Sequence, residues 1–185
     1  PADLAGHGLV PVPERARKPR PDAWARGWHE GNVNTPARLR AYKPRMVHEY
    51  RNISGDLLLS VLRVELSQKK ESGKTAKFFM PFRLSELPEE APDELLTGRE
   101  NRLGWLIRGV PPGCLRPVYG MERVPEWCEA GGRQILIVEG EKTADAARRL
   151  LNATPERADW VVFSPLGGGN SALHADWSEL AGALA

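Results

Sequence analysis

The sequence predicts an α/β fold in which a β-rich segment is followed by a parallel sheet. Two strand-like apolar runs, MVHEYR and LLLSVLRVEL, lie close together between residues 46 and 66. Further along, the apolar run QILIVEG is followed by the helical pattern EKTADAARRLLNA and then by a second apolar run, DWVVFSP. A strand, a helix and a strand in this order predict parallel strands joined by a crossover helix. We therefore expect a β-rich module over residues 46–130 and part of a parallel-sheet domain over residues 131–185.

Residues 1–45 are predicted to form an irregular arm. They include PVPERARKPRPDAWARGW, which is rich in Pro and Arg and lacks a sustained helical or strand period. Between Glu14 and Arg45, nine Lys or Arg residues stand against three acidic residues. A basic arm of this kind either contacts phosphates or stays a solvated tail, and the sequence leaves both interpretations open.

Composition and charge exclude several classes of protein. The apolar runs fall short of the roughly 18 residues needed to span a membrane, and no secretory signal pattern begins the chain. The net charge of +2 is too small to indicate nucleic-acid binding by itself. Cys114 and Cys128 form no C-x-x-C pair, which excludes a cysteine-rich zinc ribbon and fits a reducing cytoplasm. Because the sequence begins at Pro1, we expect a processed, trimmed or incomplete piece.

Residues 46–130 are predicted to be rich in strands. The turn residues of NISGD join the first two runs, so these are expected to form a β-hairpin. AKFFMPFRL is the next expected strand, and Pro81 indicates that it ends there or lies at a sheet edge. GWLIRGV is expected to add a short strand, and a tight turn followed by a helix is expected around Tyr119 and Gly120.

Residues 131–185 have the most regular pattern. QILIVEG is an uninterrupted apolar run, which is typical of a central strand buried on both faces. The following helix is expected to turn one apolar face inward and two arginines outward. The inward positions are Ala144, Ala147, Leu150 and Leu151, and the outward ones are Arg148 and Arg149. After the second strand come the glycine loop LGGGNSA and HADWSELAGALA, a further turn or helix.

Polar groups are predicted to gather at the carboxyl ends of these two strands. Glu139 ends the first strand and Gly167–Gly169 follow the second, at the sheet edge where parallel sheets bind ligands. Gly140 is expected to let the chain turn sharply after the carboxylate. Glu141 and Asp145 add negative charge near the helix start, so this edge is a candidate site for a hard divalent cation such as Mg²⁺. The alternative is that Glu139 only caps the helix.

Of two common nucleotide-binding loops, the P-loop is rejected and the dinucleotide-binding loop is only weakly supported. Gly73-Lys74-Thr75 matches the end of a P-loop, but the first glycine of that motif would have to occupy position 68, which is Gln68. LGGGNSA lacks the G-x-G-x-x-G spacing of a dinucleotide fold. The glycines at 167–169 therefore serve either a tight turn or a different kind of site.

ILIVEGEKTADAA, followed by VVFSPLGGGNSALHADWSELAG, closely resembles the first half of a Toprim domain. The resemblance is to the Toprim domains of primases and primase-helicases from phages, plasmids and integrated elements. Upstream, GDLLLSVLRVE, AKFFMPF and RPVYGMERV resemble the N-terminal part of the bacterial primase catalytic core. The resemblance extends over roughly residues 46–185. It implies a primase-core module followed by a partial, Rossmann-like Toprim domain.

The resemblance implies roles for individual residues. Glu139 matches the Toprim glutamate, which acts as acid or base or through Mg²⁺ or Mn²⁺ in nucleotidyl transfer. Gly140 matches the glycine that follows it, and Gly167 and Gly168 match the glycine turn after the second Toprim strand. The basic residues that match positions facing template or incoming nucleotide are Arg63, Lys77 and Arg116.

The implied activity is the synthesis of RNA primers on single-stranded DNA in the replication of a mobile element or phage. The implied partners are a single-stranded DNA template, nucleoside triphosphates and a helicase domain or subunit, with no membrane. Two alternatives share parts of the pattern. One is a Toprim nuclease or topoisomerase-like fragment, which has the glutamate, and the other is a non-catalytic module that binds single-stranded DNA. The upstream β-rich pattern favours the primase.

The sequence departs from the Toprim pattern in two places. Many primases have an acidic residue four positions after the glutamate, but Thr143 stands there and Asp145 lies two positions further on. The Asp-x-Asp motif that should follow the segment ending at Ala185 is absent. We therefore expect a chain truncated before that motif, which makes no primers by itself and leaves a sheet edge unpaired.

Overall fold

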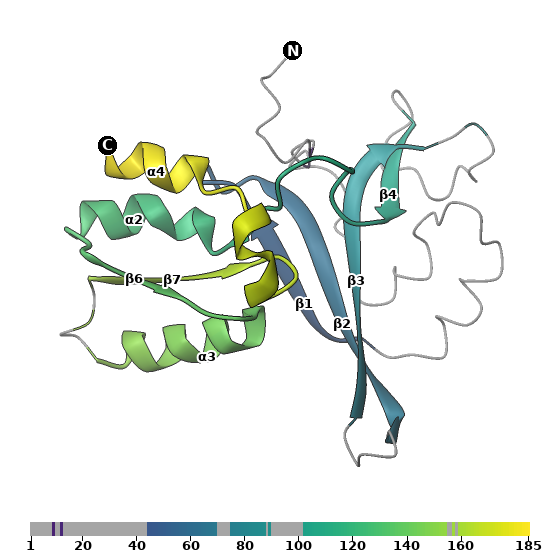
Figure 1. The fold of residues 1–185 in the computed structure, drawn as a ribbon, viewed down its shortest axis with the longest axis horizontal. Helices are drawn as coiled ribbons and strands as arrows, with labels where there is room; N and C mark the ends of the chain where they lie inside the picture. Colours follow the sequence, from purple (N-terminus) through teal and green to yellow (C-terminus); the bar gives the residue numbers. More distant parts are fainter. Residues whose placement is uncertain are drawn as a thin grey trace. The chain divides into compact units, whose positions relative to one another are not determined.

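The computed structural model describes residues 9, 12, 44–69, 75–87, 89, 102–154, 157 and 159–185. The predicted arm over residues 1–45 lies almost entirely outside this set. The described part is a mixed α/β fold with a four-stranded antiparallel sheet and a small mixed sheet (Figure 1). At this level the predicted α/β class is confirmed. Among the described residues, no helix combines the length and apolar character needed to cross a membrane.

The chain divides into two compact units. The α/β unit combines Tyr50–Leu57 with Val110–Ala185, and the β-sheet unit combines Leu9–Glu49 with Leu58–Gly109. The predicted division at residues 45 and 130 stays a prediction.

The larger sheet has the strand order β1-β2-β3-β4. Its strands are β1 (Pro44–Arg51), β2 (Leu57–Lys69), β3 (Thr75–Glu86) and β4 (Leu103–Ile107). The turn between β1 and β2 confirms the predicted hairpin, because Asn52 N–H donates to the Asp56 carbonyl at 3.0 Å and Asn52 Oδ1 accepts from Asp56 N–H at 2.7 Å. Gly55 has φ 85°, a left-handed conformation that favours glycine.

Of the two alternatives predicted for Pro81, the end of the strand was wrong, whereas an edge position is confirmed locally. β3 continues through Pro81 to Glu86 and has neighbours on both sides in the sheet order. Pro81 pairs with Val61 of β2, but pairing with β4 begins only at Phe82. Within the described residues, Pro81 therefore has a strand partner on one side of β3 only, and its missing N–H leaves no gap in the β3–β4 ladder.

The smaller sheet forms the centre of the α/β unit and has the strand order β5-β7-β6. Its strands are β5 (Val118–Tyr119), β6 (Gln134–Ile137) and β7 (Trp160–Pro165). β6 and β7 are parallel, as the strand-helix-strand order predicts, and β5 pairs antiparallel with the end of β7. The helices are η3 (Met121–Arg123), α2 (Val124–Glu129), α3 (Glu141–Asn152), η5 (Gly169–His174) and α4 (Ser178–Leu184).

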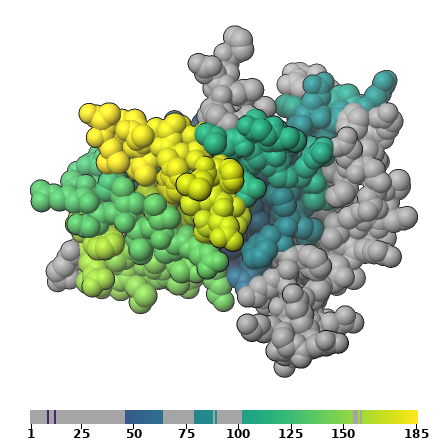
Figure 2. Space-filling view, in the orientation of Figure 1, coloured from purple at the N-terminus to yellow at the C-terminus, as the bar shows by residue number. Residues whose placement is uncertain are grey.

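Helices cover both faces of this sheet. Figure 1 shows α2 and α4 on one side of β6 and β7 and α3 on the other. One core joins α2 and α4 to the sheet through Trp127, Phe163 and Leu180, and a second joins α3 to Val162 through Ala144 and Leu151. In Figure 2 the yellow C-terminal segment lies against green residues of the same unit.

Three details of the predicted strand and helix were wrong. β6 is an edge strand within the described sheet, and Ile135 and Ile137 are 37% and 53% exposed, so the strand is not buried on both faces. Leu150 is 72% exposed and does not belong to the inward face of α3. Arg148 turns inward, and its side chain is only 11% exposed. An uninterrupted apolar run predicts a central strand, but the run itself gives no information about which strands and helices cover it.

Candidate functional site

Glu139 lies where β6 gives way to α3. The strand ends at Ile137, and Val138 N–H donates to the Phe163 carbonyl at 2.9 Å, which holds this end of β6 beside β7. Glu139 itself is exposed. The N-cap of α3 is Gly140, and within the described residues no side-chain hydrogen bond caps this end of the helix. The structure therefore does not support the alternative that Glu139 only caps the helix.

The glycine loop after β7 lies against Glu139. A Cβ added to Gly168 would lie 3.3 Å from the Glu139 carbonyl oxygen and 3.8 Å from its Cγ, and a Cβ on Gly169 would lie 3.8 Å from the same Cγ. Gly167 and Gly168 have φ 93° and 84°, so the turn needs residues that tolerate a left-handed backbone. The two parallel strands thus bring Glu139 and the predicted glycine turn together, as their common edge requires.

Gly140 does not need to be a glycine on geometric grounds. Its backbone is extended, with φ −155° and ψ 161°, and a Cβ there would meet nothing within 4 Å. The sharp turn expected at this position is instead made by the start of α3, where Ala144 N–H donates to the Gly140 carbonyl at 2.9 Å.

Arg116 holds the glycine loop. Its Nη1 donates to Ser171 Oγ at 2.5 Å and to the Leu166 carbonyl at 3.4 Å. Its backbone bonds the far side of the same loop, since Arg116 N–H donates to the His174 carbonyl and the Arg116 carbonyl accepts from Asp176 N–H, both at 2.7 Å. Arg116 therefore tethers both ends of the segment that lies beside Glu139, and its contacts here are to protein groups.

The other two carboxylates of the predicted cluster are engaged elsewhere. Glu141 is buried and accepts a hydrogen bond of 2.5 Å from the Tyr50 hydroxyl. Asp145 accepts from the Tyr119 hydroxyl at 2.9 Å and pairs with Arg148 at 3.3 Å. Among the described residues, no three His, Cys, Asp or Glu side chains lie together to hold a metal ion. At this strand end, Glu139 is the one exposed carboxylate of the three.

One carboxylate still fits a particular mode of Mg²⁺ binding. Mg²⁺ keeps several waters and is commonly held by one or two carboxylates together with substrate phosphates. Glu139, exposed beside a loop of small residues, fits the protein part of such a site, whereas Glu141 and Asp145 do not.

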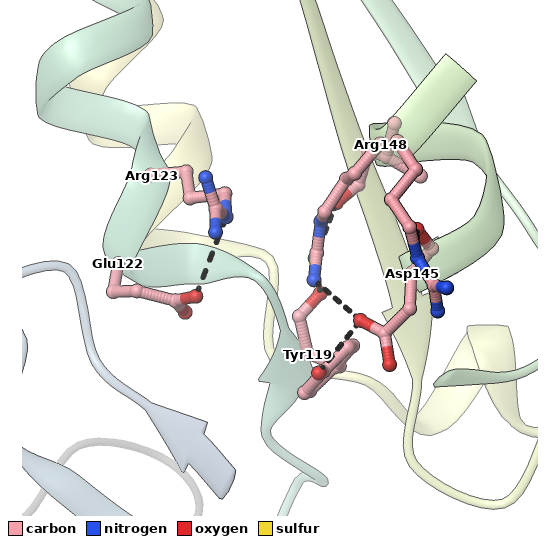
Figure 3. A network of polar contacts seen from close by, with 7 residues as sticks. Tyr119, Glu122, Arg123, Asp145 and Arg148 are labelled. Atoms are coloured by element: carbon pink, nitrogen blue, oxygen red, sulfur yellow. Dashed lines mark hydrogen bonds and ion pairs between the residues drawn. The ribbon is translucent and has the colours of Figure 1, made fainter. Parts of the chain in front are cut away.

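A polar network behind this site centres on Arg148. Figure 3 shows Asp145 and Arg148 of α3 directed toward Tyr119 of β5. The Arg148 guanidinium lies 4.6 Å from the centroid of the Tyr119 ring and donates to the Val162 carbonyl at 2.8 Å. Gly120 leaves room for it, since an added Cβ would overlap Arg148 and lie 2.7 Å from the Val162 carbonyl oxygen. Arg148 thus occupies the side of β7 that the two-residue β5 leaves open.

Two tyrosines in this network have perturbed hydroxyl groups. Burial, followed by the neighbouring Glu141 carboxylate, raises the pKa of Tyr50 well above its usual value. Burial, followed by the hydrogen bond to Asp145, raises the pKa of Tyr119 to about 12. Both tyrosines therefore act as neutral hydrogen-bond donors to carboxylates, and their rings lie 5.4 Å apart.

The remaining predicted site residues lie in the β-sheet unit. Arg63 lies in β2 opposite Phe79, and its side chain is buried, with 6% exposed. Lys77 lies in β3 with its backbone opposite Glu65. Both residues belong to a different unit from Glu139, and their expected role in facing nucleic acid stays a prediction.

Sequence reasoning missed the part played by Arg148 and by Ser171. Asp145 and Arg148 have the i, i+3 spacing at which side chains meet on a helix, a signal that was present in the sequence. The contact of Arg116 with Ser171, across 55 positions, has no such local signal.

Comparisons with known proteins do not place the chain in a family. No family model matches it, and neither a curated protein nor a solved structure shows a significant match.

Proposed function

We propose that the chain is part of a Toprim-type DNA primase, in which the α/β unit supplies the glutamate of a metal-dependent nucleotidyl-transfer site. The substrates are nucleoside triphosphates and a single-stranded DNA template, and a helicase domain or subunit is the proposed partner. The observation that carries this proposal is the position of Glu139, exposed at the end of one of two parallel strands and in contact with the glycine turn that follows the other.

The residues around Glu139 fit the demands of phosphoryl transfer. The reaction needs groups that position phosphates and balance developing charge, and a bound Mg²⁺ or Mn²⁺ would supply the Lewis acid. Glu139 would hold that ion. Gly167–Gly169 bring the backbone close to this edge without side chains in the way, and Arg116 fixes the loop in place.

The proposal does not depend on Arg63 and Lys77. The resemblance assigns both to a groove for template or nucleotide, but the Arg63 side chain is buried. Arg116 is assigned a positioning role, since its contacts are to Ser171 and to loop carbonyls.

The test is primer synthesis by the natural polypeptide that contains residues 1–185, on an unstructured single-stranded template with ribonucleoside triphosphates and Mg²⁺ or Mn²⁺. Glu139→Gln keeps the side-chain size and removes the charge, so we expect it to lower primer synthesis by about 100-fold or more. The control is Glu129→Gln, because Glu129 is an exposed carboxylate at the end of α2. It should leave the rate unchanged.

Several outcomes would contradict the proposal. Equal primer synthesis by Glu139→Gln and the unaltered protein would remove Glu139 from the reaction. Salt-sensitive binding of single-stranded DNA without any primer synthesis would favour a non-catalytic binding module. Metal-dependent cleavage or relaxation of DNA would favour a nuclease or a topoisomerase-like enzyme.

A further inference from the structure

A second candidate site lies at the opposite end of the small sheet from Glu139. Gln134 and Trp160 pair at the start of β6 and β7, whereas Glu139 follows the other end of β6. At the Trp160 end, a pocket of about 360 Å³ opens between α2, the C-terminal half of α3 and the start of β7. This volume lies within the range of small-ligand sites in proteins, about 300–1,000 Å³.

The charged lining of this pocket is predominantly basic. Arg123, Arg148 and Arg157 contribute to it, and Glu126 is the acidic residue among the lining groups. Arg148 is already bound to the Val162 carbonyl and to Asp145. The Arg123 side chain is 47% exposed and has a contact of 3.7 Å with the neighbouring Glu122.

Arg157 and Arg123 together form the basic rim of the pocket. Arg157 is exposed, and no ion pair is found for it within the described part of the chain. Arg123 and Arg157 therefore present two guanidinium groups at the pocket that are at most weakly neutralised. Guanidinium groups bind phosphate oxygens through paired, charge-assisted hydrogen bonds, so an anion with phosphate chemistry fits this rim.

Two tryptophans form the aromatic part of the wall. Trp127 is buried and its Nε1 donates to the Asp159 carbonyl at 2.7 Å, so this ring is fixed in place. Trp160 is partly exposed at the start of β7. A planar aromatic ligand gains stacking energy on such a ring, and this energy depends little on which polar groups the ligand carries.

An extended peptide fits this pocket less well than a compact ligand. Peptides commonly bind a sheet edge by adding a strand to unpaired backbone groups. Here the Val162 carbonyl, which an added strand would need as a hydrogen-bond acceptor, already accepts from the Arg148 guanidinium. The open side of β7 is therefore blocked for strand addition, while the rim of Arg123 and Arg157 stays open to solvent.

We propose that this pocket binds a nucleoside phosphate, with the base against Trp160 and the phosphates between Arg123 and Arg157. The arrangement has no need of a divalent metal and shares no residue with the Glu139 site. The inference therefore stands independently of the proposed primase activity.

The experiment is calorimetric titration of the chain with ADP in the presence of EDTA at low salt. Saturable binding is expected, and the pair Arg123→Ala with Arg157→Ala should weaken it about tenfold or more. Arg133→Ala with Arg149→Ala is the matched control, since both residues are exposed and neither lines the pocket. This control removes the same charge and should change the affinity by less than about twofold. Trp160→Leu should weaken ADP binding about fivefold or more.

Further measurements distinguish this site from other binding sites. Glu139→Gln should leave ADP binding in EDTA unchanged, so failure of the primase proposal would not affect this result. Absence of saturable binding up to about 1 mM ADP would overturn the inference. So would an equal loss in the control pair, which would indicate unspecific charge attraction. Tripolyphosphate or a polyglutamate peptide that binds as tightly as ADP would also overturn it, because neither contains a base.

Discussion

β6 and β7 lie side by side in one sheet but differ in their environment. Both come from uninterrupted apolar stretches of the sequence. In β7 every residue from Val161 to Pro165 is buried, whereas in β6 Ile135 and Ile137 are 37% and 53% exposed. β7 has strands on both sides and helices on both faces, and β6 has one strand neighbour within the described sheet. An apolar run therefore indicates only that a strand can be buried, whereas the neighbouring strands and helices decide whether it is.

The two open sides of the sheet also differ. Beyond β5, the side of β7 is occupied by Arg148, which binds the Val162 carbonyl. No comparable side chain bonds the outer side of β6 in the part of the chain that the structure describes. Unpaired strand edges pair readily with other chains, so β6 is the side of this sheet most open to association.

The largest expected effect distinguishes the two strands directly. Phe163 is fully buried in β7, so Phe163→Ala should lower the free energy of unfolding by about 3–5 kcal/mol. Ile137→Ala should cost less than about 1 kcal/mol, because half of that side chain is already in water. Urea unfolding followed by the helical circular dichroism signal measures both, since the described α-helices all belong to the α/β unit. Similar losses for the two variants would contradict the contrast between β6 and β7.

The next effect tests the protected side of β7. Arg148→Ala removes the partner of the Val162 carbonyl and of Asp145, and should lower the free energy of unfolding by about 2–3 kcal/mol. Arg149→Ala removes the same charge from the exposed face of α3 and should change stability by less than about 0.5 kcal/mol. The same urea titration compares the pair. If Arg148→Ala left the free energy of unfolding unchanged, the network around Tyr119 would not stabilise the unit.

A substitution at Gly120, directly after β5, tests the same region around Arg148. Gly120→Ala places a methyl group against Arg148 and the Val162 carbonyl at a backbone φ of 100°, so we expect a loss of about 1–2 kcal/mol. Gly182→Ala in α4 is the control, because its Cβ would meet nothing within 4 Å. Since alanine favours helices, that change should leave stability equal or raise it by up to about 1 kcal/mol. In thermal unfolding, the two variants should shift the unfolding temperature in opposite directions or by clearly unequal amounts.

The smallest expected effect is a dependence on alkaline pH. The pKa of Tyr119 is raised from 10 to about 12 in the folded chain, so the folded state holds its proton more tightly than the unfolded state. This contribution to stability is fully present below pH 10 and is lost as the pH rises from 10 to about 12. Tyr119→Phe should make the decline in this range shallower when unfolding is measured at a series of pH values. An identical decline in both proteins would contradict the assignment to Tyr119 and would point to Tyr50, a second tyrosine whose pKa is raised.

Much of the α/β unit was predictable from local pattern. The strand-helix-strand order predicted parallel β6 and β7, and turn residues predicted the hairpin at Asn52–Asp56 and the turn at Gly120. These features depend on backbone preferences and on periodicity within a few residues, which the sequence states directly. The proximity of Glu139 to the glycine loop was predictable too, because parallel strands share one carboxyl edge.

Local sequence pattern was enough to predict the strands, the helices and the edge at which Glu139 and the glycines meet, because these depend on residue preferences and on the direction of parallel strands. The tertiary structure alone decided that Arg148 turns inward, that Arg116 tethers the loop through Ser171, and that Ile137 stays exposed. These outcomes depend on which distant side chains share a space, and a polar group such as the Arg148 guanidinium is buried only where partners such as the Val162 carbonyl compensate its loss of water.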